Sequence, residues 1–261
     1  MLQSEHKEHV RRLAAEFNAL YRAREPLDLA RAIGVRLEYG DLGDKDGAYD
    51  PERNVVFLSR RASPERQRFT MAHEVTHFLI LTDEDFLSDL HDAYEGDHLE
   101  ENIEVLCNIG ASEILVPRAE LEPLLLRYGA SARGLAKIVK NFGVSKPAAC
   151  VALVEHMQEA AIVAVCRAKG KTQTRRDTLH GGGNQARVLE VSFAAKTELA
   201  KYSLAHGSQI PTDHPLHVAL TTGLPLEQRT YVPFKSGKKM PALMDAHPDG
   251  STVMVVFRLE V

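Results

Sequence analysis

The stretch RFTMAHEVTHFLI, residues 68–80, places two histidines four residues apart, with a glutamate directly after the first, in a mostly apolar run. On an α-helix, a four-residue step advances about 6 Å and returns to nearly the same face, so His73 and His77 can bind one metal ion. Glu74 lies about a third of a turn from His73, where its carboxylate reaches a water at the metal instead of the metal itself. The stretch therefore predicts an HExxH zinc-peptidase helix.

A third ligand is expected, because zinc hydrolases use three protein ligands and leave a fourth position open. The stretch EVLCN places Glu104 and Asn108 one turn apart on the following helix. We expect Glu104 to bind the metal and Asn108 to hydrogen-bond a ligand. His98, Glu101 and Glu113 remain rival third ligands.

The order of these motifs carries a resemblance. FTMAHEVTHFLI followed by EVLCNIGASEILVP is similar to the ImmA/IrrE family of bacterial metallopeptidases, whose pattern is a phenylalanine-led HExxH helix and then E, three residues and N. PLDLARAIGVRLEY and GAYDPERNVVFLS resemble that family's lead-in, so the resemblance covers most of residues 20–155. With the modules that follow, the whole chain resembles the family's radiation-response members.

The resemblance implies zinc, or alternatively manganese, bound by His73, His77 and Glu104. Glu74 is then the general base, and Asn108 supports a ligand. The resemblance further implies a protein substrate, a basic helix-turn-helix transcriptional repressor, whose cleavage induces DNA-damage and radiation-response genes.

Three positions depart from the family's usual pattern. Thr76 stands where relatives usually have glycine, and Cys107 and Gly110 replace the commoner alanine and phenylalanine. These departures put the local packing in question, but not the ligands.

The fold class predicted is α+β, with three domains. Residues 1–118 form the zinc-peptidase domain, 119–159 a helix-turn-helix-like module and 160–261 a GAF-like α+β domain. The first domain should contain a helix over 2–23, a helix opened by Pro26 and stopped at Gly34, strands, the HExxH helix opened by Ser63, an acidic loop-like segment over 82–97, and a helix over 99–116.

The two later modules are less specific. Helix, Gly143-Val144-Ser145 turn and helix leave DNA contact open against protein packing, with phosphate contacts available from four cations, Arg133, Lys137, Lys140 and Lys146. In the last domain, EAAIVAVCRA, ARVLEVSFA and STVMVVFRLEV alternate like strands, AKTELAKYSLAHG reads as a helix, and GKTQTRRDTLHGGGNQ reads as a loop. The family context implies a sensor domain, with a small-molecule ligand as a candidate partner.

The composition describes an ordinary soluble protein: 261 residues, 44% hydrophobic, 26% charged, with a net charge of -4. Charges occupy the place of a signal peptide's apolar core and no window approaches a membrane span, so we expect a cytoplasmic protein without a membrane partner. Cys107, Cys150 and Cys166 lie far apart in apolar contexts and are expected to be buried and unpaired.

Local charge is more informative than the total. Residues 78–117 contain eleven acidic residues and no Lys or Arg. Such an acidic rim would steer a basic repressor toward the site. The alternative function is a DNA-binding or ligand-sensing regulator whose metal site is structural. For a second oxyanion donor the candidates are unranked: Tyr49, His91, Tyr94 and His98.

Overall fold

The computed structural model describes residues 2–170 and 188–260. The chain forms two compact units: Met1–Glu122 with Phe142–Ser145, called here the N-terminal unit, and Pro123–Asn141 with Lys146–Val261, called the C-terminal unit. The helices predicted as a separate module over 119–159 thus group mainly with the C-terminal sheet. Both units mix helices with a sheet, which confirms the α+β class.

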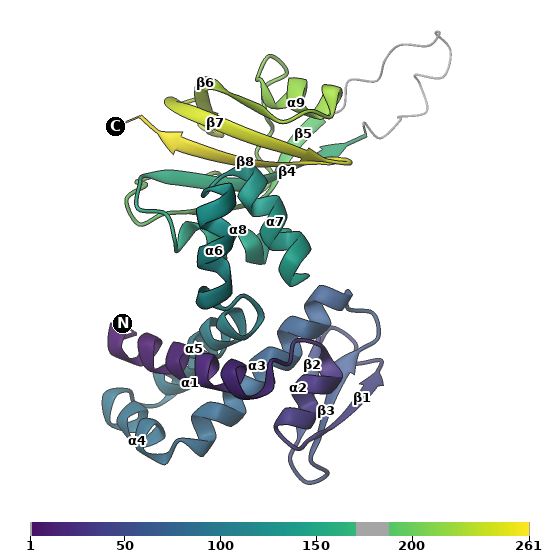
Figure 1. Ribbon diagram of the computed structural model, residues 1–261, viewed down its shortest axis with the longest axis vertical. Helices are drawn as coiled ribbons and strands as arrows, with labels where there is room; N and C mark the ends of the chain where they lie inside the picture. Colours follow the sequence, from purple (N-terminus) through teal and green to yellow (C-terminus); the bar gives the residue numbers. More distant parts are fainter. Residues whose placement is uncertain (1, 171–187, 261) are drawn as a thin grey trace. The chain divides into compact units, whose positions relative to one another are not determined.

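The N-terminal unit combines helices with a small sheet (Figure 1). Its helices are α1 (Ser4–Tyr21), α2 (Pro26–Ala32), α3 (Pro64–Thr82), α4 (Glu84–Ala93) and α5 (Asp97–Leu115), and α6 (Arg118–Tyr128) begins in this unit. The strands β1 (Arg36–Gly40), β2 (Gly47–Asp50) and β3 (Val55–Ser59) form a sheet of order β1-β3-β2, parallel between β1 and β3 and antiparallel between β2 and β3.

The helix α3 begins and packs as its sequence predicts. Ser63 caps it by accepting a hydrogen bond from the Arg66 N–H at 3.3 Å, and Pro64 occupies the first turn. Its buried side chains include Met71, Val75 and Ile80. The helix packs against α5, α2 and β3, so it is the central element of the unit.

The sequence predicted a loop for the acidic segment 82–97. The segment instead contains helix α4. Asp83 caps this helix by accepting from the Phe86 N–H at 3.1 Å. Phe86 and Leu90 lie one turn apart and are both buried, while the acidic side chains remain outside. Two apolar residues at helical spacing and a cap were sufficient to form the helix.

In the C-terminal unit, helices cover an antiparallel sheet. Its strands have the order β5-β4-β8-β7-β6, and they are β4 (Ala161–Lys169), β5 (Val188–Lys196), β6 (Leu226–Pro233), β7 (Lys239–Asp249) and β8 (Thr252–Leu259). Helices α7 (Ala132–Phe142) and α8 (Lys146–Val154) lie on one face and α9 (Leu216–Thr222) on the other (Figure 1). The predicted helix AKTELAKYSLAHG was wrong: strand β5 runs into it as far as Lys196, and the rest is turns and irregular chain. The predicted loop 170–185 lies almost entirely outside the described residues.

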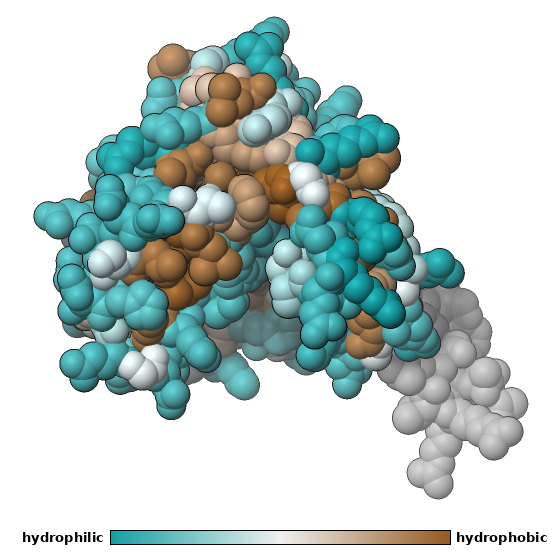
Figure 2. Space-filling view, turned by 90° about the horizontal axis from the view of Figure 1, so that it is seen from below, coloured by the Kyte–Doolittle hydropathy of each residue, from teal (hydrophilic) through white to brown (hydrophobic). Residues whose placement is uncertain are grey.

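The surface is largely hydrophilic on one face (Figure 2), and the cysteines are buried. On the face shown in Figure 2, hydrophilic residues predominate and hydrophobic residues gather in patches. Cys107, Cys150 and Cys166 are free and buried, which confirms that prediction. Among residues 2–170 and 188–260, no helix combines the length and the apolar character that crossing a bilayer requires.

Two of the three unusual positions face each other across the contact of α3 with α5. A Cβ built on Gly110 would lie 2.3 Å from Thr76 Cγ2 and 2.7 Å from its hydroxyl oxygen. Gly110 therefore leaves the space that the Thr76 side chain occupies. The two departures from the family pattern compensate each other sterically.

We expect Gly110→Ala to destabilise the protein by about 1–3 kcal/mol, because overpacking at this contact outweighs the ~1 kcal/mol gain in helix propensity. Thr76→Ala in the same chain should restore most of the loss. Urea unfolding of the two single variants and the double variant gives the coupling energy. Purely additive effects would show that the two positions do not compensate.

Candidate metal centre

The helices α3 and α5 bring the predicted residues together. His73 and His77 lie one turn apart on α3, with their ring centroids 4.9 Å from each other. Glu104 of α5 reaches both of them: its Oε2 lies 3.2 Å from His73 Nε2 and its Oε1 lies 3.1 Å from His77 Nε2. Three ligand groups therefore converge on one point between the two helices.

Asn108 orients one of these histidines. His73 Nδ1 lies 3.2 Å from Asn108 Oδ1, an oxygen that can only accept, so the ring proton points toward Asn108. This leaves the Nε2 lone pair for a metal. Burial, together with the charge of His77, lowers the pKa of His73, while Glu104 opposes the shift. The neutral imidazole, which is the metal-binding form, is thus favoured.

Glu74 stands beside the cluster in a partly buried position. Burial raises the pKa of its carboxyl, His77 opposes that shift, and Glu104 adds to it. Glu74 and His77 also line a small apolar cavity of about 110 Å³ whose other lining residues are Ile33, Val35, Tyr49, Val56, Phe78 and Leu81. A carboxyl group and an apolar recess therefore share one side of the cluster.

Cys107 is a fourth potential donor. Its sequence context had predicted only a buried small residue. Its sulfur and one nitrogen each of His73 and His77 lie within 4.8 Å of one another. Burial, with the charges of Glu104 and Glu74, holds the pKa of the Cys107 thiol well above its usual range. The signal was its position on α5, one turn after Glu104 and directly before Asn108.

The rival third ligands have other contacts. His98 Nδ1 lies 3.3 Å from Glu101 Oε2, and both side chains are mostly exposed. Glu113 is buried and accepts the N–H of Arg118 at 2.9 Å. Glu104 is thus the candidate that the structure brings to His73 and His77.

The oxyanion candidates also separate. Tyr49 lines the cavity beside Glu74, and its hydroxyl donates to Asn54 Oδ1 at 3.0 Å. Tyr94 instead contacts His6 Nδ1 at 3.0 Å, and His91 is exposed on α4. Tyr49 is thus the candidate that the structure brings to the cavity.

Three of the four cations of the helical module, Arg133, Lys137 and Lys146, have contacts within the protein. Arg133 and Lys137 lie 5.4 and 5.3 Å from the ring centroid of Tyr128. Lys146 pairs with Asp249 at 2.7 Å. The helix α8 packs against β4 and β5, so one face of this helix is already covered.

Comparisons with known proteins identify the family of the chain. The peptidase family M78 model, described as the IrrE N-terminal-like domain, matches residues 30–154. Two relatives are described as radiation response metalloprotease IrrE. The one from Deinococcus deserti is 44% identical over 254 residues, covering 97% of this chain and 88% of that protein. The one from Deinococcus radiodurans is 42% identical over 257 residues, covering 97% and 78%.

A solved structure described as a Mycobacterium tuberculosis transcriptional regulator is similar to this chain, with a TM-score of 0.57 and 14% sequence identity. The match covers 98% of this chain and 76% of the solved chain, and it shows a likeness of fold alone. The family assignment rests on the M78 match and on the two relatives, which confirm the resemblance seen in the motifs. The chain is therefore a metalloendopeptidase that belongs to the IrrE-type M78 family.

Proposed function

We propose that this protein is a zinc-dependent endopeptidase that cleaves a helix-turn-helix transcriptional repressor and thereby induces DNA-damage and radiation-response genes. The observation that carries the catalytic part is that the Glu104 carboxylate lies 3.2 Å from His73 and 3.1 Å from His77, with Glu74 beside them. The target is supported by charge and by the relatives' description as radiation response proteases.

The donor set fits zinc. Two imidazole nitrogens and a carboxylate form the His₂Glu ligand set of hydrolytic zinc sites, and Asn108 fixes one imidazole. A bound zinc ion would lower the pKa of water and polarise the peptide carbonyl. Manganese is an alternative, because imidazole and carboxylate donors also accept it.

Glu74 acts as the general base. Its carboxylate takes the proton of the attacking water and passes it to the nitrogen of the leaving amine, so that the C–N bond breaks with a neutral leaving group. Partial burial suits this role, because it brings the pKa of the carboxyl closer to neutral pH.

The cavity beside Glu74 selects the peptide. Val35, Val56 and Leu81 make its wall apolar, so it accepts an uncharged aliphatic side chain next to the scissile bond. Tyr49 lies at the same cavity, and its hydroxyl can turn from Asn54 to the developing oxyanion. The substrate segment therefore has an apolar residue at the cleavage position.

The repressor is inferred from charge. In the sequence, acidic residues of 78–117 lie on both sides of Glu104. Repressors that bind DNA are usually basic, so this segment would attract them. The C-terminal unit supplies none of the residues assigned to chemistry, so we assign it a regulatory role, as a GAF-like domain that binds a small ligand or docks the substrate. We place the protein in the cytosol, where three buried free cysteines stay reduced.

A second candidate function is favoured by Cys107. If its thiolate joins His73, His77 and Glu104, the shell has four protein ligands and closes. A closed shell is typical of a structural site, and the protein would then act as a DNA-binding or ligand-sensing regulator. Glu74 would have no role in such a site, which is why the peptidase is preferred.

Glu74→Gln should keep the metal and the fold but reduce cleavage about 10²- to 10⁴-fold, because the amide fills the same space and cannot accept a proton. The assay is cleavage of a purified candidate repressor by zinc-loaded protein, followed by gel electrophoresis. Loss of operator binding by the treated repressor provides a second readout of cleavage. Wild-type turnover by the variant would remove Glu74 from the mechanism.

Glu104→Ala should lose most of the bound metal, whereas Cys107→Ala should retain one ion per chain. Glu113→Gln is the matched control, because it changes a carboxyl on the opposite face of the same helix, where it accepts the Arg118 N–H. Metal content by mass spectrometry checks all three. Loss of metal in Cys107→Ala would favour the closed, structural site.

Tyr49→Phe should lower kcat roughly 10²-fold and leave KM nearly unchanged, since an oxyanion donor acts in the transition state. Steady-state kinetics on a peptide that spans the cleavage site separates the two constants. Asn54→Ala, which frees the tyrosine hydroxyl without removing it, should retain kcat. An effect of Tyr49→Phe on KM alone would assign the residue to substrate binding.

A further inference from the structure

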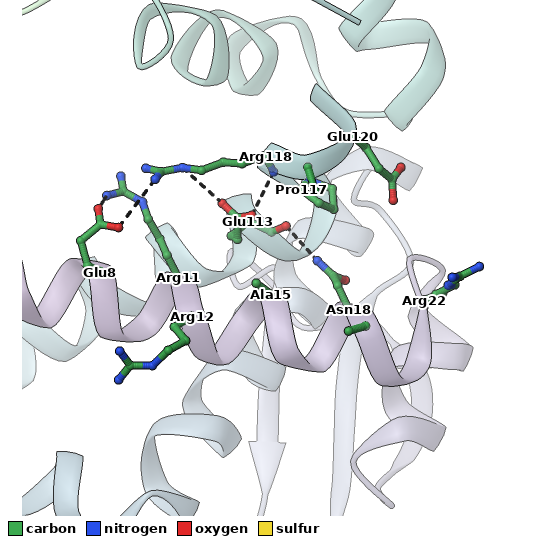
Figure 3. A pocket seen from close by; sticks show the side chains of 12 residues that line it. Glu8, Arg11, Arg12, Ala15, Asn18, Arg22, Glu113, Pro117, Arg118 and Glu120 are labelled. Atoms are coloured by element: carbon green, nitrogen blue, oxygen red, sulfur yellow. Dashed lines mark hydrogen bonds and ion pairs between the residues drawn. The ribbon is translucent and has the colours of Figure 1, made fainter. Parts of the chain in front are cut away.

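A second cavity opens in the N-terminal unit, between α1 and the junction of α5 with α6 (Figure 3). Its volume of about 550 Å³ lies within the range of small-ligand sites, about 300–1,000 Å³. Glu113, which lines it, follows Glu104 by nine residues, about two and a half helical turns, and therefore lies on the opposite face of α5. The cavity is separate from the metal centre.

Two of the glutamates in the lining are held by arginines. Glu8 Oε1 accepts from Arg11 Nη1 at 2.5 Å, and its Oε2 lies 3.6 Å from Arg118 Nη1. Glu113 accepts the Arg118 N–H at 2.9 Å and lies 3.7 Å from its guanidinium. Figure 3 shows Arg118 reaching from α6 toward these two carboxylates. These charges are balanced within the wall.

The remaining charged residues of the lining are Arg12, Arg22 and Glu120, which leave a positive excess. Glu120, the third glutamate, pairs with Arg24, which is outside the lining, at 2.7 Å. Arg22 lines the cavity and is exposed. It forms no ion pair with any residue of the described ranges 2–170 and 188–260. Arg22 also has a φ of 49°, a left-handed conformation that favours glycine or asparagine at a helix end. An unpaired arginine thus stands at a position that suits a different residue.

Asn18 adds a hydrogen-bond acceptor. Its side chain is only 9% exposed, and its Nδ2 donates to the Glu113 carbonyl oxygen at 3.0 Å, which fixes the orientation of the amide. Its Oδ1 has no hydrogen-bond partner among the described residues. A buried acceptor of this kind is usually satisfied by a donor.

We propose that this cavity binds a small organic anion that also carries a hydroxyl or N–H donor. The anionic group, a phosphate or a carboxylate, pairs with Arg22, and the donor bonds Asn18 Oδ1. Exposed Ala15 and Ala19 of α1 form a flat wall that leaves room for the carbon skeleton. Since Glu113 and Asn18 hold the end of α5, the ligand would act on the helix that carries Glu104.

Isothermal titration calorimetry of the full-length zinc-loaded protein tests this site, with four probes: ribose 5-phosphate, citrate, inorganic phosphate and ribose. Ala19→Trp fills the cavity from an exposed helix position and should abolish binding. Leu20→Trp is the control, because Leu20 is 76% exposed and does not line the cavity. Arg22→Gln should weaken binding about 10- to 100-fold, as the loss of a charge-assisted hydrogen bond does, and Arg22→Lys should weaken it less.

Saturable binding of ribose 5-phosphate or citrate, lost in Ala19→Trp and retained in Leu20→Trp, supports the proposal and shows whether phosphate or carboxylate is preferred. Binding that survives Ala19→Trp overturns it, as does the failure of both organic anions to bind at millimolar concentration. Equal affinity for inorganic phosphate overturns the role of Asn18, and equal affinity for ribose overturns the role of charge. The same titrations with Glu74→Gln separate this site from catalysis, because binding there does not require turnover.

Discussion

The close approach of α3 and α5 is the constraint on which the rest of the N-terminal unit depends. Thr76 fills the space that Gly110 leaves, and this contact lies between His73 and His77 on one helix and two residues beyond Asn108 on the other. A wider spacing would carry Glu104 away from His73 and His77. The metal centre is therefore a property of how two helices pack, and only secondarily of which residues they carry.

The HExxH helix could be predicted from sequence because its signals are local. Capping by Ser63, the four-residue histidine spacing and the apolar run all act within one element. The proximity of Glu104 depends on tertiary packing, and there the family pattern supplied what spacing could not. The sequence did not indicate Cys107 as a donor, because a cysteine that is merely buried and a cysteine near a metal can have the same apolar sequence context.

In two other segments the amino-acid composition concealed the secondary structure. Residues 82–97 were read as a loop because acidic side chains dominate them, although Phe86 and Leu90 are enough to anchor α4. In 195–207 the helical spacing was present, but pairing of β5 with β4 extends to Lys196 and takes precedence. In the first case a local cap and apolar spacing decided the outcome, and in the second a long-range strand pairing overrode the local preference.

The position of the histidines within α3 has a consequence for how the metal is gained and lost. The helix has 19 residues, and His73 and His77 lie in its interior, between the buried side chains of Met71 and Ile80. Helix interiors anchored in a core open rarely, whereas ends fray. The ligand scaffold is therefore assembled by the hydrophobic core before any ion arrives, unlike that of a zinc finger, which folds only with its metal. A chelator would thus silence this protein reversibly, leaving a folded chain that recovers when metal returns.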